Sequence, residues 1–191
     1  MIKKEHISGI VVLLLLVAIG IFVFYWRTGT EAVPGDYQVK TGNYRLEDGQ
    51  YAEAMEEFNK ALERNPKHTA AHLGLAITYM QMKQNDRSLH HFTRAIELDP
   101  NFAVAYADRG VLHDRMGNYA LALKDYQTAL ALNPKLAEGP GWLWRFMRNI
   151  HEKQPTIADR AGYLDEELKK PPKDRVLLVP EIDEKQRMYK K

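Results

Sequence analysis

The sequence predicts an all-α protein: an α-solenoid of three helix hairpins plus a degenerate capping hairpin, preceded by one transmembrane helix. Two observations carry this prediction. Pro66, Pro100 and Pro134 stand 34 residues apart, and a fixed interval of about that length is typical of repeat architectures. Ahead of them, residues 7–26 form an uncharged and strongly apolar run.

The apolar run is long enough to cross a membrane. As a helix, its 20 residues reach about 30 Å, the thickness of a hydrocarbon core. Tyr25 and Trp26 lie where an interfacial aromatic belt is expected, and two lysines before the run favour a cytoplasmic N-terminus. We therefore expect residues 1–27 to be a single-pass anchor, in a bacterial inner membrane, with the folded part outside the cytoplasm.

A cleaved signal peptide is the alternative to an anchor. It needs a shorter apolar core, about 7–15 residues, and a small-x-small cleavage site. Thr30-Glu31-Ala32 matches such a site poorly. Cleavage would instead give a soluble periplasmic protein. In either case residues 28–36, which are polar and contain a Pro-Gly turn, are expected to be a short tether.

Residues 35–136 divide into three units of 34 residues, which are 35–68, 69–102 and 103–136. The third unit has glycine at places 8 and 15, alanine at places 20 and 27 and an aromatic residue at place 24. The first unit repeats this pattern, and the second keeps most of it. Small residues let two antiparallel helices approach closely, and glycine allows a positive φ where a helix ends. One such hairpin cannot bury its own apolar face, so stacking makes the core.

This pattern resembles the tetratricopeptide repeat family over residues 35–136. Two departures stand out. Lys83 replaces the turn glycine of the second unit, so that turn is expected to carry strain or a different geometry. Gln38, Thr41 and Arg45 replace larger core residues, which makes the first helix the weakest of the expected elements.

Beyond the repeats, residues 137–170 keep helical periodicity without the repeat register, and we expect them to form capping helices. Thr156 is placed to cap the second of these helices, whose apolar stripe is Ile157, Ala161, Leu164 and Leu168. Trp142 and Trp144 belong to the first and are a possible secondary contact for a partner. After Pro171-Pro172, residues 171–191 are expected to be an extended basic tail.

The residue types argue against an enzyme. The chain has no cysteine and only two serines, Ser8 in the apolar run and Ser88 at a packing place. It has no Gly-rich phosphate loop, and Pro155 stands where a zinc-protease motif after His151-Glu152 needs its second histidine. We expect no catalytic, cofactor-binding or metal-binding residues. An enzyme or small-molecule binder built on the stack remains the alternative, and turnover of a small substrate would favour it.

Charge argues against nucleic-acid binding. Residues 28–168 carry 16 Lys and Arg against 20 Asp and Glu, which is unlike a surface that follows phosphates. The expected partner is a protein, most simply a neighbouring membrane protein. The chain would then be a scaffold, assembly factor or accessory subunit of a membrane-associated complex.

The resemblance also assigns a partner-binding groove. In the family, places 5, 9 and 12 of each first helix face the concave side. Here these places hold Val39, Asn43, Leu46, Leu73, Ile77, Met80, Ala107, Val111 and Asp114. Seven of the nine are apolar, so we expect the groove to hold an apolar segment. The alternative occupant is the chain's own segment 176–179.

Chaperone adaptors of the family hold a partner's C-terminal carboxylate with a clamp of lysine, arginine and asparagine. The corresponding places here are Val39, Asn43, Gly74, Val104 and Asp108. Only Asn43 matches the clamp, so we expect no binding of chaperone tails.

Overall fold

The computed structural model describes residues 14–21, 33–139 and 155–178, and the chain divides into two compact units, Met1–Val33 and Pro34–Lys191. In the first unit, residues 14–21 are helical and their side chains are exposed. None of the helices in these described ranges is long and apolar enough to cross a bilayer. Most of the expected span 7–26 lies outside them, so the anchor stays a prediction.

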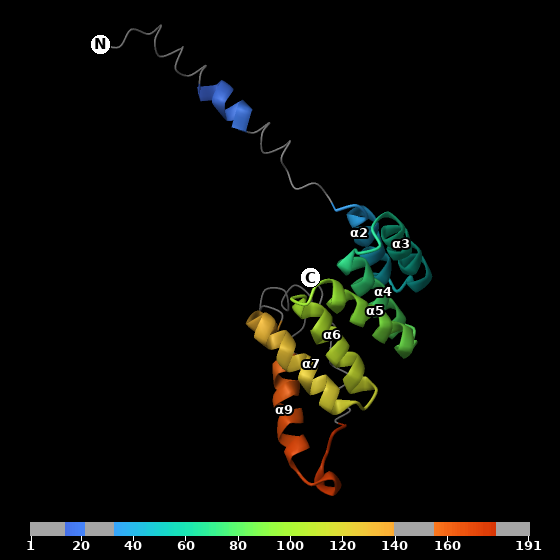
Figure 1. Cartoon of the computed structure of the whole chain (residues 1–191), viewed down its shortest axis with the longest axis vertical. Coiled ribbons are helices and arrows are strands. Elements are labelled where there is room, and N and C mark those ends of the chain that lie inside the picture. The colour runs from blue at the N-terminus through green and yellow to red at the C-terminus, as the bar shows by residue number, and fades with distance from the viewer. Residues whose placement is uncertain (1–13, 22–32, 140–154, 179–191) are drawn as a thin grey trace, which may run out of the picture. The chain divides into compact units, whose positions relative to one another are not determined.

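The second unit is built from helices paired into consecutive hairpins (Figure 1). The pairs are α2 (Asp36–Glu47) with α3 (Tyr51–Arg64), α4 (Thr69–Gln81) with α5 (Asn85–Leu98), and α6 (Ala103–Arg115) with α7 (Tyr119–Leu132). Each hairpin packs on the next through α3 against α4 and α5 against α6. The all-α stack of hairpins is therefore confirmed.

Aromatic residues of the second helices fill the space between hairpins. Phe58, Phe92 and Tyr126 are all 0% exposed. A Cβ atom built on Gly74 would lie 2.3 Å from the Phe58 ring, and one on Gly42 would lie 2.7 Å from it. The Phe58 ring therefore lies against both α2 and α4, and it fits only because each helix presents hydrogen there instead of a side chain.

The turn between α4 and α5 carries strain. Gly49 and Gly117 end α2 and α6 with φ of 74° and 76°, and Lys83 takes the same left-handed conformation with φ of 59°. The second hairpin thus keeps the geometry of its neighbours although its residue has a Cβ. Of the two outcomes expected for Lys83, the structure has the strained turn and not a different geometry.

The first helix, the weakest of the expected elements, is a continuous helix over Asp36–Glu47. Gln38 is buried, and the Thr41 hydroxyl donates to the Tyr37 carbonyl at 3.0 Å. Arg45 Nη1 donates to Gln50 Oε1 at 2.7 Å across the turn into α3. Local hydrogen bonds therefore accommodate Thr41 and Arg45, whereas Oε1 of the buried Gln38 has no hydrogen-bond partner among the described residues.

The C-terminal part of the unit is a capping helix. A 3₁₀ turn, η1 (Pro134–Ala137), follows α7, and α9 (Ile157–Lys169) packs against α7 and η1. Thr156 caps α9 as expected: its hydroxyl accepts from the Asp159 N–H, and the Asp159 carboxylate accepts from the Thr156 N–H. A second 3₁₀ turn, η2 (Pro172–Asp174), begins the tail. Trp142 and Trp144 lie outside the described residues.

Candidate partner-binding face

The nine residues assigned to the groove lie on α2, α4 and α6, the first helices of the three hairpins. We call them the inner face. Eight of the nine are buried, and only Asn43 is exposed. The sequence predicted that these residues are mostly apolar. It did not predict that most of their side chains are buried.

Helix α4 shows this covering most clearly. Nine of its 13 residues are buried, and its neighbours are α2, α3, α5 and α6. Leu73, Ile77 and Met80, which follow one another at helical spacing along one side of α4, are 6%, 4% and 4% exposed. They belong to one hydrophobic cluster with Val39 and Leu46 of α2. Burial of these apolar side chains stabilises the packing of α4 against its neighbours through the hydrophobic effect.

The α6 part of the inner face belongs to a second cluster. Ala107 and Val111 are fully buried in it, together with Tyr126 of α7 and apolar residues of α9. Leu177, from the segment after η2, packs against the same cluster. Leu177, from the last described segment, therefore packs against the hydrophobic cluster that contains Ala107 and Val111 of the inner face.

Asp114 has a structural role. Arg160 Nε donates to Asp114 Oδ2 and Arg160 Nη2 to Asp114 Oδ1, both at 2.7 Å. The Tyr126 hydroxyl also donates to Asp114 at 3.2 Å. Arg160 is 1% exposed and Asp114 is 5% exposed. This buried pair joins α9 to α6, so the Asp114 carboxylate is engaged within the fold.

Sequence reasoning missed Arg160. Its position did contain a signal, because it lies three residues after Ile157 and four before Leu164, on the apolar stripe of α9. A charged residue on a buried stripe needs a partner of opposite charge. That partner could not be named from spacing alone, since Asp114 lies 46 residues away.

Side chains of α9 hold the segment that follows η2. Arg160 Nη2 donates to the Leu177 carbonyl at 2.9 Å, and the Tyr163 hydroxyl donates to the Val176 carbonyl at 2.5 Å. The Val176 N–H donates to Glu167 Oε2 at 2.8 Å. Bonding first to Lys170 and then to this N–H lowers the pKa of Glu167. Three residues of α9 thus bind the backbone of an extended segment.

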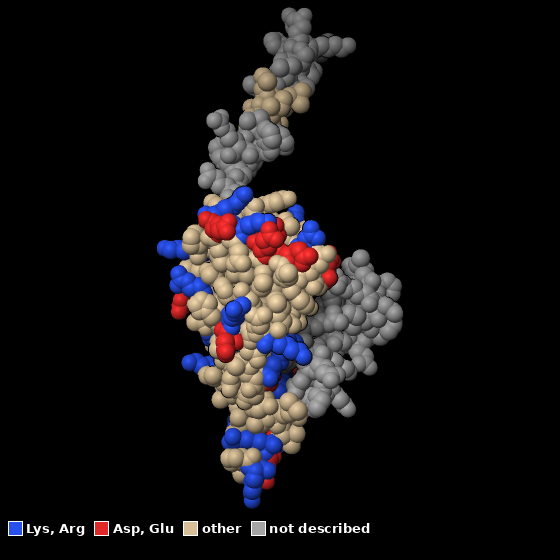
Figure 2. All heavy atoms as spheres, turned by 90° about the vertical axis from the view of Figure 1, so that its right-hand side faces the viewer, with Lys and Arg blue, Asp and Glu red and all other residues tan. Residues whose placement is uncertain are grey.

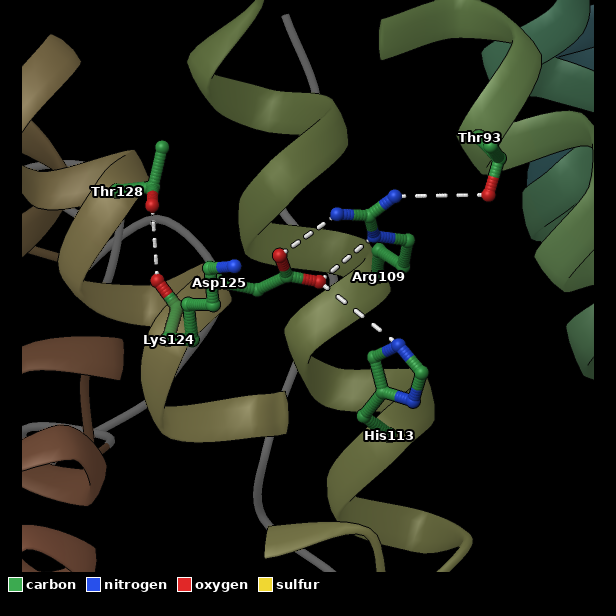
Figure 3. A network of polar contacts seen from close by, with 6 residues as sticks. All are labelled: Thr93, Arg109, His113, Lys124, Asp125 and Thr128. Carbon is green, nitrogen blue, oxygen red and sulfur yellow. Dashed lines mark hydrogen bonds and ion pairs between the residues drawn. The ribbon is translucent and has the colours of Figure 1, made fainter. Parts of the chain in front are cut away.

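A second polar network ties α6 to the helices on either side of it (Figure 3). Arg109 donates to both Asp125 oxygens, at 2.7 and 2.8 Å, and reaches Thr93 of α5 at 3.5 Å. His113 Nε2 lies 4.0 Å from Asp125 Oδ2. The bond to Asp125 raises the pKa of Arg109, and burial lowers the pKa of His113. Arg109 lies about 200° around α6 from Val111, so the network lies on the other side of α6 from this residue of the inner face.

Histidines form another cluster, between α4 and α5. His72 Nδ1 and His91 Nδ1 are 3.1 Å apart, and the His91 ring stacks on Tyr79 at 5.5 Å. Burial, and secondarily the neighbouring His72 and His90, lower the pKa of His91 to about 4. Burial also lowers the pKa of His72. Both shifts favour the neutral form of the two imidazoles. Over the described ranges, no group of three or more ligating side chains is arranged to hold a metal ion.

Surface charge is mixed. On the side of the molecule presented in Figure 2, Lys and Arg are interspersed with Asp and Glu over the repeats. Several are paired along a helix, such as Lys60 with Glu56 and Glu57, and Lys169 with Asp165. Such pairs are solvated and contribute little to binding of a polyanion.

Comparison with known proteins agrees with the helical arrangement. Two family models, both described as tetratricopeptide repeat, match residues 45–108 and residues 103–136. No curated protein matches the chain in sequence. The matches therefore identify the kind of repeat and leave the partner to be inferred from the site.

Solved structures share the fold at low identity. The first TPR of Spaghetti (RPAP3), bound to the HSP90 peptide SRMEEVD, is 18% identical with a TM-score of 0.57, covering 73% of this chain and 97% of that one. The second TPR of the same protein, bound to the same peptide, is 23% identical with a TM-score of 0.50 and coverages of 52% and 93%. The Arabidopsis OM64 TPR domain is 20% identical with a TM-score of 0.51 and coverages of 53% and 84%.

Proposed function

We propose that this chain, a tetratricopeptide-repeat protein, is a protein–protein interaction module that serves as scaffold, assembly factor or accessory subunit of a membrane-associated complex. The observation that carries the proposal is the composition of the inner face. Seven of its nine residues are apolar, and they come from the first helices of three successive hairpins. A row of this kind suits an apolar helix or extended segment from a partner.

We further propose that the ligand is not an acidic C-terminal tail. Two of the similar structures hold the HSP90 peptide SRMEEVD. In this chain Val39, Gly74, Val104 and Asp108 occupy four of the five clamp places, and all four are buried. None is cationic, and the Asp108 carboxylate would repel a ligand carboxylate. Asn43 alone could donate a hydrogen bond.

The membrane location is part of the proposal. It rests on the uncharged run 7–26 and on the short tether that follows it. Because the chain has no cysteine, an Asn43→Cys variant has a single thiol. In bacterial spheroplasts, a membrane-impermeant maleimide should label this thiol without lysis. Labelling only after lysis would reverse the topology, and a mature chain that begins after residue 26 would replace the anchor with the soluble alternative.

Cross-linking from the same position tests partner binding. Asn43 is the exposed member of the inner face, and Asn59 of α3 is an exposed asparagine on the other helix of the same hairpin. Cysteine at each position, coupled to a benzophenone maleimide, makes a matched pair of probes. In native membranes the probe at 43 should cross-link to one partner polypeptide, and mass spectrometry should identify the captured segment.

The probe at 59 is the control, because it carries the same label on the other helix of the same hairpin. Cross-links of equal yield from both positions would indicate random collisions, and cross-links from 59 alone would place the partner on the outer helices. Either result would contradict the assignment of the inner face.

A further inference from the structure

Two histidine nitrogens face each other between α4 and α5. His72 Nδ1 and His91 Nδ1 are 3.1 Å apart, and His72 Nε2 lies 3.3 Å from the carbonyl oxygen of Pro66. A carbonyl oxygen only accepts hydrogen bonds, so His72 carries its proton on Nε2 and presents a lone pair at Nδ1. Between the two rings alone, His91 Nδ1–H donates to that lone pair.

The His91 ring is held from two sides. It stacks on Tyr79 with an interplanar angle of 19°, and the His90 ring meets it edge-on with the centroids 5.2 Å apart. His72 is buried, whereas His91 is half-buried. One nitrogen is therefore fixed inside the hairpin, and the other belongs to a ring that borders solvent.

The separation of the two nitrogens fits two ligands of one metal ion. With metal–nitrogen distances of about 2.0–2.1 Å, the separation of 3.1 Å gives an angle at the metal of about 95–100°. This angle lies between those of tetragonal and tetrahedral coordination. The bond from His72 Nε2 to the Pro66 carbonyl is also the kind of outer contact that orients a metal-binding imidazole.

The surroundings of the pair are compatible with a cation. Burial lowers the pKa of both histidines, which favours the neutral imidazoles that a metal ion needs. The positive charge of Arg94 acts on His72, but Arg94 is paired with Glu97 at 3.0 Å. The described residues supply no group of three or more ligands, so water fills the remaining positions of the ion.

We propose that His72 and His91 form an open, two-histidine site for a divalent transition metal ion of the Ni²⁺, Cu²⁺ and Zn²⁺ class, which imidazole nitrogen suits. The ion replaces the proton shared by the two Nδ1 atoms, and His91 then carries its proton on Nε2, so both rings stay neutral. The proposal departs from the expectation of no metal-binding residues, because a separation of 19 residues is not a spacing that sequence reasoning recognises. The site shares no residue with the inner face, so it does not depend on the proposed function.

The test is a titration of the full-length chain with Cu²⁺ in a mild detergent. The chain has seven histidines, so variants at adjacent positions are needed to separate this site from weaker surface binding. His91→Gln should weaken the tightest Cu²⁺ binding by at least about tenfold, since loss of even an outer contact of a metal ligand has an effect of that size. His90→Gln is the matched control, because His90 is its exposed neighbour on α5, and it should leave that affinity unchanged.

A measurement on the parent chain removes the dependence on folding of the variants. Cu²⁺ is paramagnetic, so a small fraction of one equivalent should broaden the imidazole NMR signals of His72 and His91 more than those of the other histidines. Broadening that is strongest at another histidine would overturn the inference. Equal Cu²⁺ affinity in the parent and in His91→Gln, or an equal loss in His90→Gln and His91→Gln, would also overturn it.

Discussion

Arg160 of α9 and Asp114 of α6 form a buried two-pronged ion pair, with both N–O distances 2.7 Å. The same guanidinium donates to the carbonyl of Leu177. One side chain therefore joins the last repeat, the capping helix and the C-terminal segment. Because both charges are buried away from water, removing either residue would leave the charge of the other without compensation.

Removing one member of this pair should be costly. Asp114→Ala leaves the buried Arg160 cation without its counter-charge, and we expect a loss of about 3–5 kcal/mol in the free energy of unfolding, measured by urea denaturation. Replacing both residues together, as Asp114→Leu with Arg160→Met, should bring stability back to within about 1 kcal/mol of the parent. Equal losses in the single and double variants would show that the pair itself is not the cause.

Gly74→Ala should destabilise the stack. The new Cβ would lie 2.3 Å from the Phe58 ring, and overpacking of this kind costs about 1–3 kcal/mol. Adding Phe58→Leu should recover part of the loss in thermal melting. At Gly162 of α9 nothing lies within 4 Å of a Cβ, so Gly162→Ala should instead stabilise by about 0.5–1 kcal/mol. A neutral Gly74→Ala would mean that the Phe58 ring is not confined between the helices.

Lys83→Gly should stabilise the second hairpin. Lys83 holds φ at 59°, a conformation that glycine adopts without the Cβ strain, and the added entropy of glycine in the unfolded chain offsets part of the gain. We expect a net increase of about 0.5–1 kcal/mol in the free energy of unfolding. Gly117→Ala is the reverse experiment: a Cβ there meets nothing within 4 Å, so its loss of stability reports backbone strain, reduced by the lower entropy of alanine in the unfolded chain, with no contribution from a clash.

Stability should fall in mild acid because of the paired histidines. The pKa of His91 is about 4 in the folded chain, against 6.5 for a free imidazole. Between these two pH values the unfolded chain binds a proton at His91 that the folded chain does not. The contribution of His91 to the free energy of unfolding is therefore fully present above pH 6.5 and decreases as the pH falls towards 4. His91→Phe should flatten the dependence of the melting temperature on pH, whereas a change at exposed His90 should preserve most of it. An unchanged slope in His91→Phe would assign the effect to other groups.

The hairpins could be predicted because the small residues and prolines of each repeat stand where two helices pack closely or where one hairpin joins the next. Gly42 permits the close approach of the Phe58 ring, and the prolines at intervals of 34 mark the joints between hairpins. Each such signal is local and is repeated, so three copies reinforce one another. Lys83 shows the limit of this reasoning, because sequence alone left strain and altered geometry open, and the φ of 59° in the structure distinguishes them.

The candidate site was less accessible to prediction. Places in the repeat assigned Ile77 and Met80 to the inner face, but spacing within a repeat says nothing about what covers that face. The same holds for Arg160 with Asp114 and for Tyr163 with Val176, which are contacts between the repeats, the capping helix and the tail. The capping helix and the tail lie outside the repeat register, so the repeat pattern does not predict which residues they contact.

The most direct test of an apolar inner face is a fluorescence-anisotropy titration of the full-length chain at low and high salt, with two labelled peptides. One is the partner segment identified by cross-linking from position 43, and the other is SRMEEVD. We expect the partner segment to bind with an affinity that changes less than about twofold across this range, because apolar contacts are not screened, and SRMEEVD not to bind. Tight binding of SRMEEVD that weakens with salt, or no binding of the partner segment, would contradict the apolar inner face.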